Sequence, residues 1–320
     1  MGPDPASAVC RRTEGRGGIS MRGRLRLGGR AGLVMVAGMS LLLAGTSISS
    51  AAEQKATTTA SPAALVVKNN DFNGDTNSDV LSVDTTGRLW LYPGNGAAGW
   101  LPRIGYSQGW DAMTAILAPG DFDGDGKADL IAIDSAGYLI LYSGNGQGGW
   151  LLWKRYGSGW NTMTSIFGPG DFNGDGHMDV LARQNTGQLW LYPGDGNGGW
   201  LQRVGYGTGW NAMTSLRGPG DFDGDTFVDL TARDAGGSLW LYRGDGHGGW
   251  LPGRTLIGSG WQNLTAIVSP WDFNGDDKVD LLVRNASGQL YMYRGSGTGG
   301  WTLPAVLVGS GWNSMTAITA

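Results

Sequence analysis

Short apolar runs separated by turns organise the chain from residue 71 onward. A representative stretch has four of them, at Met113–Leu117, Leu130–Ile133, Tyr138–Tyr142 and Trp150–Arg155. Runs of this length, bounded by clusters of glycine and aspartate, predict β-strands. The chain has 59 glycines but only two glutamates, a composition that disfavours exposed helices. The sequence therefore predicts an all-β protein.

The same arrangement recurs five times with a period of 50 or 51 residues, which indicates a repeat architecture. Each unit opens with Asp-Phe-Asn/Asp-Gly-Asp, followed by a Leu-Trp-Leu-Tyr-like strand, a glycine-rich turn and a Gly-Trp segment. Four short antiparallel strands in a unit of this length are typical of a propeller blade. The sequence predicts a five-bladed β-propeller over residues 63–320. Its repeats start near Asp71, Asp121, Asp171, Asp221 and Asp272.

The two ends of the repeat region overlap by one strand. Met315–Ala320 occupies the same repeat positions as Met113–Ala118, and so does Ala63–Lys68. Pairing of the terminal strands in one sheet would close the ring and remove the free edges of an open array. A stacked solenoid is the competing architecture, but it would need capping units at both ends.

Residues 1–52 have the features of a secretory signal peptide. A basic stretch begins at Met21, an apolar stretch covers Ala31–Gly45, and small residues lead to Ala52. Met21 opens a complete signal sequence by itself, so it is an alternative start. Residues 53–62 are rich in alanine, threonine and serine and predict a flexible leader. We therefore expect a secreted, extracellular protein without a membrane span in its mature form.

Removal of residues 1–52 changes the charge and the cysteine content. Seven arginines and two acids leave with this segment, so that 16 basic and 25 acidic residues remain, a net charge of −9. This charge disfavours a nucleic-acid partner. Cys10, the only cysteine, leaves as well, so no disulfide can stabilise the loops of the mature chain.

The aspartate-rich loops have the spacing of calcium sites. Oxygen-bearing side chains stand at loop positions 1, 3, 5 and 9 of every repeat, and hard cations take such oxygen ligands. An EF-hand is excluded because its position-12 glutamate is replaced by Ala132 in the second repeat. The bland alternative is that these residues only form turns. We predict about five structural Ca²⁺ ions. The predicted ligands are Asp71, Asn73, Asp75, Asp79, Asp121, Asp123, Asp125, Asp129, Asp171, Asn173, Asp175, Asp179, Asp221, Asp223, Asp225, Asp229, Asp272, Asn274, Asp276 and Asp280.

Two family resemblances follow from these motifs. The segment Gly-Asp-Phe-Asp-Gly-Asp-Gly-Lys-Ala-Asp-Leu, which contains Asp121, resembles the FG-GAP or VCBS repeat, the calcium-loop propeller blade also found in integrin α-subunits. Integrin propellers have seven blades, so their ligand sites are not transferred to this chain. The segment Trp250–Gln262 is similar to the repeat of tachylectin-type lectins, five-bladed propellers that bind N-acetylated amino sugars but lack the aspartate loop. The second resemblance implies carbohydrate recognition.

The mature chain offers little for catalysis. It has two histidines, His177 and His247, at non-equivalent repeat positions, and no glutamate beyond Glu53. No Cys-His pair or glutamate acid/base pair can be built from this set. We predict no catalytic residue. An aspartate-dependent glycoside hydrolase or other secreted hydrolase is the less favoured alternative, with Asp84, Asp134 and Asp234 available, although each stands before a turn glycine.

Repeated tryptophans are the candidate binding residues, because flat aromatic rings stack on sugars and adjacent polar side chains can bind hydroxyl or acetamido groups. Five equivalent sites would recognise a cell-wall or amino-sugar glycan multivalently. In the competing interpretation the rings fill the seams between blades. The candidates are Trp110, Asp111, Trp160, Asn161, Trp210, Asn211, Trp261, Gln262, Trp312 and Asn313.

A protein-interaction or adhesion platform is the alternative function. It would use one asymmetric surface where the copies diverge. Such differences occur at Ile140, Trp153, Trp271 and Tyr291.

Overall fold

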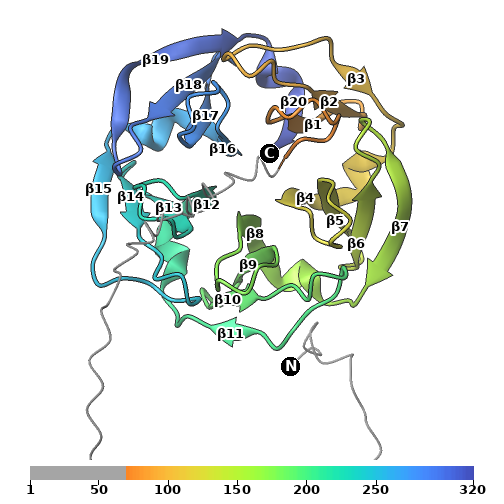
Figure 1. Cartoon of the computed structure of the whole chain (residues 1–320), viewed down its shortest axis with the longest axis horizontal. Coiled ribbons are helices and arrows are strands. Elements are labelled where there is room, and N and C mark those ends of the chain that lie inside the picture. The colour runs from red at the N-terminus through yellow and green to blue at the C-terminus, as the bar shows by residue number, and fades with distance from the viewer. Residues whose placement is uncertain (1–69) are drawn as a thin grey trace, which may run out of the picture. The chain divides into compact units, whose positions relative to one another are not determined.

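Five four-stranded antiparallel sheets form a closed ring in the computed structural model, which describes residues 70–320 (Figure 1). Blade 1 contains β20 (Met315–Thr319), β1 (Val80–Asp84), β2 (Leu89–Tyr92) and β3 (Ile104–Gly105). Blade 2 contains β4 (Met113–Gly120), β5 (Asp129–Asp134), β6 (Leu139–Gly144) and β7 (Trp150–Tyr156). Blade 3 contains β8 (Met163–Gly170), β9 (Asp179–Gln184), β10 (Leu189–Tyr192) and β11 (Val204–Gly205). Blade 4 contains β12 (Met213–Gly220), β13 (Asp229–Asp234), β14 (Leu239–Tyr242) and β15 (Thr255–Gly258). Blade 5 contains β16 (Leu264–Trp271), β17 (Asp280–Asn285), β18 (Leu290–Gly295) and β19 (Trp301–Gly309).

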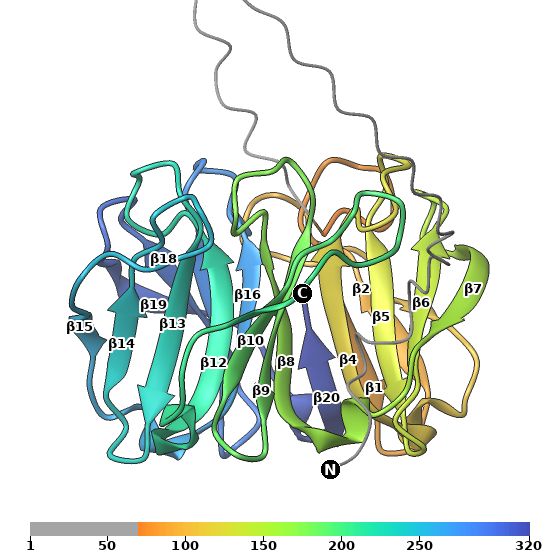
Figure 2. The same ribbon diagram turned by 90° about the horizontal axis from the view of Figure 1, so that it is seen from below.

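The observed architecture confirms the predicted five-bladed propeller. The four apolar runs predicted for blade 2 coincide with β4 to β7. In every blade the order runs from an inner strand at the ring axis to an outer strand at the rim, and Figure 2 shows the blades side by side around that axis. The predicted signal peptide (1–52), leader (53–62) and strand at 63–68 lie outside the described residues.

The helical content of residues 70–320 is limited to five short 3₁₀ turns that precede the inner strands. They are η1 (Trp110–Ala112), η2 (Trp160–Thr162), η3 (Trp210–Ala212), η4 (Trp261–Asn263) and η5 (Trp312–Ser314). Each follows a left-handed glycine, such as Gly109 at φ 103°, a conformation that other residues adopt only with strain. Within residues 70–320, no helix has the length and apolar character needed to cross a bilayer.

The ring is closed by the last strand of the sequence. β20 pairs antiparallel with β1, with Val83 opposite Ala317, and so supplies the inner strand of blade 1. The hydroxyl of Thr316 also donates to the carbonyl of Val83 at 3.1 Å. The last and first repeats therefore share one sheet, as the overlap of the repeat ends predicts, and the inner edge of blade 1 is paired.

The apolar core lies in the five seams between adjacent blades. At the seam between blades 1 and 2, buried Leu89 and Leu91 of β2 pack with Trp110 and with Leu130 of β5. Alternate residues of β2 point the other way, toward blade 5, where Tyr92 packs against Trp312 with ring centroids 4.6 Å apart. Each blade thus uses both faces for packing, which explains why its strands carry apolar residues at successive positions.

Three seams contain an arginine bridge that two seams lack. Arg183 of β9 donates from Nη1 to the carbonyls of Trp210 and Met213 in the following turn. Arg233 and Arg284 make the equivalent bonds to the next turns along the ring. The corresponding residues of blades 1 and 2 are Val83 and Ile133, both buried and aliphatic. The seams are therefore chemically different although the repeats are similar.

Removing residues 315–320 should destabilise the whole ring, because the deletion exposes the inner edge of β1 and removes buried Met315. We expect the melting temperature to fall by about 10 °C or more. Differential scanning calorimetry measures it. Leu303→Ser, a change at a side chain 70% exposed in the same repeat, serves as control and should shift the melting temperature by no more than about 2 °C. Equal stability of the shortened and full chains would contradict closure by β20.

Candidate functional site

The first aspartate of each loop organises the loop backbone. In the first repeat, Oδ1 of Asp71 accepts hydrogen bonds from the N–H groups of Gly74 and Asp75 at 2.7 and 3.1 Å, and its Oδ2 accepts one from Thr76 at 2.8 Å. The same three bonds recur at Asp121, Asp171, Asp221 and Asp272. These three hydrogen bonds therefore fold the loop backbone around the carboxylate.

The ninth residue of each loop is a fully buried aspartate. Asp129 accepts N–H groups of Phe122 and Asp123 on Oδ2, at 2.9 and 3.0 Å, and the N–H of Gly144 on Oδ1 at 2.9 Å. Its carboxylate thereby fastens the loop to the end of β6. Equivalent bonds to the phenylalanine and the hairpin glycine are made by Asp79, Asp179, Asp229 and Asp280.

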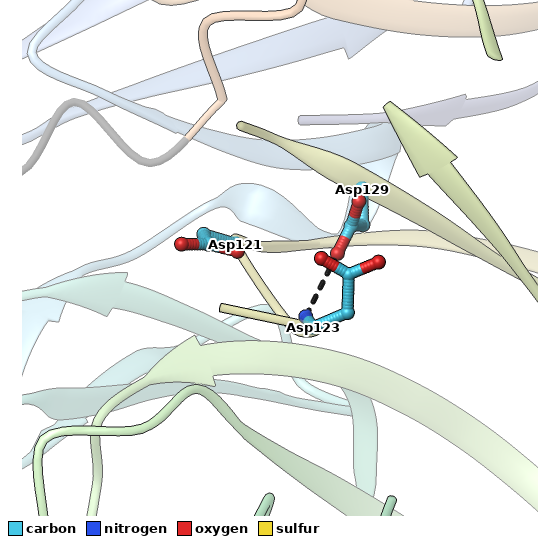
Figure 3. Close-up of side chains that lie close together, drawn as sticks. All are labelled: Asp121, Asp123 and Asp129. Carbon is cyan, nitrogen blue, oxygen red and sulfur yellow. Dashed lines mark hydrogen bonds between the residues drawn. The ribbon is translucent and has the colours of Figure 1, made fainter. Parts of the chain in front are cut away.

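In each of two loops, three carboxylates lie close enough together to share one ion. Oxygens of Asp121, Asp123 and Asp129 lie within 4.8 Å of one another, as drawn in Figure 3, and those of Asp221, Asp223 and Asp225 do the same. The buried Oδ1 of Asp123 has no hydrogen-bond partner, while its Oδ2 accepts the hydroxyl of Ser143 at 2.5 Å. A buried carboxylate oxygen without a partner is costly unless a cation completes its coordination.

The other three loops carry an amide at position 3, and the first and third therefore have one carboxylate fewer, whereas the fifth has an additional one at Asp277. In the first loop, Nδ2 of Asn73 donates to Oδ2 of Asp75 at 3.0 Å, and its Oδ1 accepts the N–H of Asp75 at 2.8 Å. Asn173 makes the same pair of bonds with Asp175. Among the described residues, three predicted carboxylate ligands therefore converge in the second loop and three in the fourth, and Asp125 and Asp229 are not part of these groups.

Burial raises the pKa of the ninth aspartate in every loop to about 7, although two or three backbone N–H donors lower it. Repulsion from other loop carboxylates adds to the rise, for example from Asp123 on Asp129. A bound cation would act in the opposite direction and favour the charged form. The residues fit Ca²⁺, with Asp121, Asp123 and Asp129 as the ligands of the second loop, because they form a hard, oxygen-only donor set.

Each loop also contacts the next blade. The carbonyl of Phe72 accepts the N–H of Gly148 at 2.7 Å, and the Phe72 ring lies 5.9 Å from that of Trp150. A side chain on Gly74 would lie 2.4 Å from the carbonyl oxygen of Gly146, so only glycine allows this approach. The contact is repeated around the ring, with Phe122 against Trp200 and Phe273 against Trp100. The aspartate loops therefore connect neighbouring blades.

The predicted stacking tryptophans lie in the seams. Trp110, Trp160, Trp261 and Trp312 are 2–7% exposed, and each packs against a tyrosine of the next blade along the ring; the Trp110 and Tyr142 centroids are 5.0 Å apart. These rings fill the seams, as the competing interpretation expects, and their contact with a glycan stays a prediction. Both faces of each blade are apolar, so the tryptophan rings are buried between neighbouring blades. Trp210 is partly exposed and packs likewise.

The polar residues that follow these tryptophans are exposed, and they lie against the hairpin turn beside them. A side chain added at Gly87 would meet Oδ1 of Asp111, and one at Gly187 would meet Asn211. Nδ2 of Asn211 donates to the carbonyl of Asn185 at 3.1 Å. The remaining members of this predicted set occupy the same place, above the turn glycines. They are Asn161, Gln262 and Asn313.

One pocket opens at the seam between blades 1 and 2. Its volume is about 300 Å³, and four aromatic side chains line it together with Ser107, Gln108, Gly109 and Met113; the aromatic residues are Tyr106, Trp110, Tyr142 and Trp150. The indole N–H of Trp150 is buried without a hydrogen-bond partner. The equivalent N–H groups of Trp100 and Trp301 donate to backbone carbonyls.

The composition of this seam explains the pocket. Val83 leaves this seam without the bridging arginine, as Ile133 does in the seam between blades 2 and 3, and here the two-residue strand β3 also supplies no carbonyl to Trp150. Trp110 is the only pocket residue among the predicted glycan-binding residues, although Trp150 also belongs to the repeated tryptophans of the sequence. Tyr106 and Gln108 were not predicted to belong to a site, although the loss of arginine at Val83 is a visible departure from the later repeats.

The aspartates considered for hydrolysis form turns. Oδ1 of Asp84 accepts the hydroxyl and N–H of Thr86 and the N–H of Arg88, and its Oδ2 accepts the indole N–H of Trp90 at 2.8 Å. These hydrogen bonds, that of the Thr86 hydroxyl first, lower the pKa of Asp84. The bond from Trp240 likewise lowers the pKa of Asp234. A general acid needs a raised pKa, so this arrangement does not support glycosidase chemistry.

Three overlapping segments match the FG-GAP-like repeat family, at residues 71–132, 121–182 and 171–232, and together they cover half of the chain. No curated protein sequence matches this chain. Similar solved structures include a lectin of Agrocybe aegerita that recognises non-reducing terminal N-acetylglucosamine (18% identity, 78% of this chain, 68% of that chain, TM-score 0.46). The BP39L lectin of Burkholderia pseudomallei is similar at 17% identity (75% of this chain, 68% of that chain, TM-score 0.47). AofleA of Arthrobotrys oligospora, as an arginine mutant, is similar at 12% identity (75% of each chain, TM-score 0.43).

Asp123→Ala should lower the melting temperature more in millimolar calcium than in chelator, because besides the bond from Ser143 it removes an oxygen that the structure leaves unpartnered. Asp195→Ala is the matched control: Oδ1 of Asp195 accepts the N–H groups of Asn197 and Gly199 in a turn outside the loops. The control should lose equal stability with and without calcium. Equal losses for Asp123→Ala in both conditions would remove the metal role of this loop.

In chelator, the melting temperature should decrease as the pH rises from 5 to 8. The ninth aspartates have a folded-state pKa of about 7 against an ordinary value of 3.8, so the folded chain keeps protons that the unfolded chain releases. Their stabilising contribution is complete below the ordinary value and disappears through pH 7. Calcium competes with these protons, so the gain in melting temperature on adding calcium should grow over the same interval. A gain independent of pH would contradict this coupling.

Proposed function

Because this chain belongs to the FG-GAP-like repeat family, we propose that it is a secreted, calcium-stabilised propeller that acts as a non-catalytic binding module for carbohydrate. The loops support the calcium part of the proposal through their convergent carboxylates and the unpartnered oxygen of Asp123. The ions would be structural, since each loop connects two blades.

The pocket between blades 1 and 2 carries the binding part of the proposal. A volume of about 300 Å³ suits a single sugar ring and is at the lower end of small-molecule sites. Aromatic walls complement the apolar face of a sugar, and the side chains of Ser107 and Gln108 can bond its polar substituents. An acetamido group, with one donor and one acceptor, fits this set, so we propose an N-acetylated amino sugar.

The seam between blades 3 and 4 repeats part of this arrangement. Tyr206 occupies the position of Tyr106 and donates to the carbonyl of Gly248, and the indole N–H of Trp250 is again buried without a partner. Trp210 is the most exposed of the five turn tryptophans. A second, weaker site here would give bivalent binding to a glycan surface.

A protein-interaction platform is the second candidate. The outer strand of blade 2, β7, exposes Leu151, Leu152 and Trp153 by 61%, 58% and 63%. Its outer backbone edge is unpaired within residues 70–320. An apolar edge strand of this kind can add a strand from another protein.

Glycan-array binding with competition by free N-acetylglucosamine tests the first candidate. Ser107→Ala and Gln108→Ala should each weaken binding about tenfold, since each removes a hydrogen-bonding group from the pocket. Ser158→Ala, at the position equivalent to Gln108 beside the seam between blades 2 and 3, is the control and should change binding less than about twofold. Circular dichroism and melting temperature would confirm folding of each variant.

The outcomes separate the two candidates. Inhibitable glycan binding that survives both pocket substitutions would place the sugar site elsewhere. A silent array, together with binding of a protein that Trp153→Ser abolishes, would favour the platform, because Trp153 lies on β7 and does not line the pocket.

A further inference from the structure

The second and fourth aspartate loops form a matched pair. Both have aspartate at positions 1, 3, 5 and 9, whereas the other three loops have asparagine at position 3. Carboxylates at positions 1, 3 and 9 converge in the second loop, as Figure 3 shows, and those at positions 1, 3 and 5 converge in the fourth. A difference in calcium affinity between these loops therefore has to come from their surroundings or from the placement of the side chains.

The position-3 aspartate belongs to both groups but has different partners in the two loops. Asp123 accepts the hydroxyl of Ser143 on Oδ2 at 2.5 Å, and its buried Oδ1 has no hydrogen-bond partner. Asp223 accepts the N–H of Asp225 on Oδ1 at 3.3 Å, and its Oδ2 lies 3.8 Å from Nη1 of Arg243. One oxygen of this carboxylate is thus unused in the second loop, whereas both have partners in the fourth.

Ser143 and Arg243 occupy the same place in the repeat, directly after the tyrosine of the third strand of the blade. Proline stands there in blades 1 and 3 and Arg294 in blade 5, beside loops with an amide at position 3. Ser143 is buried, whereas the side chain of Arg243 is 46% exposed. This one position therefore decides whether a hydroxyl or a cation faces the position-3 carboxylate.

A guanidinium beside the converging carboxylates opposes calcium in two ways. The ion pair with Arg243 has to break before Oδ2 of Asp223 can coordinate an ion, and the positive charge repels the ion as it enters. By Coulomb's law, a single and a double positive charge about 6 Å apart in water lower the affinity about tenfold.

The second loop also contains a cation, Lys127, but this cation is placed differently. Its Nζ lies 2.9 Å from Oδ2 of Asp125, which is not part of the converging group. Both loops therefore combine four aspartates with one cation, and they differ in which carboxylate the cation holds. Lys127 can stay on Asp125 while the three converging carboxylates hold an ion, whereas Arg243 holds a member of its own group.

We propose that Arg243 sets the calcium affinity of the fourth loop, so that the second loop fills at about tenfold lower calcium than the fourth. This inference rests on the calcium part of the proposed function and adds an order of filling to it. Phe122 of the second loop contacts Trp200 of blade 3, and Phe222 of the fourth contacts Trp301 of blade 5. Falling calcium would therefore weaken the contact between blades 4 and 5 before that between blades 2 and 3.

A calcium titration followed by hydrogen exchange and mass spectrometry tests the proposal, because peptides covering residues 121–129 and 221–229 report on the two loops separately. The mature chain, residues 53–320, is first treated with chelator. In both loops, three backbone N–H groups donate to the position-1 aspartate, and their exchange should slow when an ion binds. In the wild type, the midpoint of the second loop should lie about tenfold below that of the fourth.

Arg243→Ser, which introduces the residue found at Ser143, should lower the midpoint of the fourth loop about tenfold and leave that of the second unchanged. Arg243 is exposed, so the variant should fold, and circular dichroism checks this. Arg243→Lys keeps the charge and should change the midpoint less than about threefold. Lys127→Ala is the matched control: it removes a cation held outside the converging group and should lower the second-loop midpoint less than about threefold.

The outcomes separate this proposal from the proposed function. Equal midpoints of the two loops in the wild type, or equal effects of Arg243→Ser and Lys127→Ala, would overturn the role of Arg243 while calcium binding itself still stands. If calcium slows exchange in neither loop, both this proposal and the calcium part of the proposed function are overturned.

Discussion

A buried carboxylate at the ninth loop position holds each blade in the ring. Asp129 joins the loop backbone at Phe122 to the end of β6 at Gly144, and that loop then contacts the next blade through Phe122 and Trp200. A hydrogen-bonded carboxylate, repeated five times, thus sets where the apolar seams form. The ionisation of these groups is costly in a buried place, which links the stability of the fold directly to what neutralises them.

The five seams differ in local chemistry although the repeats are similar. Where Arg183, Arg233 or Arg284 bridges to the next turn, the seam is crossed by backbone hydrogen bonds to a guanidinium. Where Val83 stands instead and the outer strand β3 has only two residues, a pocket opens beside Trp110. Binding capacity in this ring therefore arises at departures from the repeat, and the conserved positions of the repeat serve packing.

Most of the fold could be predicted because the sequence repeats with a fixed period. The 50-residue repeat and its four apolar runs are sufficient for the blade number and strand order, and the overlap of Met315–Ala320 with the earlier repeats is sufficient for ring closure. The burial of the tryptophan rings could not be predicted in this way. Whether Trp110 faces solvent or Tyr142 depends on the angle between neighbouring blades, which no single repeat encodes.

The sites that depend on one residue were also hidden from periodicity. Arg217 departs from the repeat, whose other copies have Leu117, Phe167, Val268 and Thr319, but only the ring shows that it lines a cavity on the axis together with Ser269. The aspartate loops were easier to predict, since all their candidate ligands are close together in the sequence. The short loop between them brings Asp121, Asp123 and Asp129 together.

The position of β20 has a consequence for association between molecules. This strand belongs to the fifth repeat by sequence but to blade 1 in space, and it pairs only with β1. The same strand of a second molecule would offer the same register to β1, so an exchange of closing strands would restore the pairing between β20 and β1 in each ring. Such domain-swapped dimers become favoured at high protein concentration, where the loss of translational entropy is smallest. Ring closure is therefore also a built-in route to oligomers.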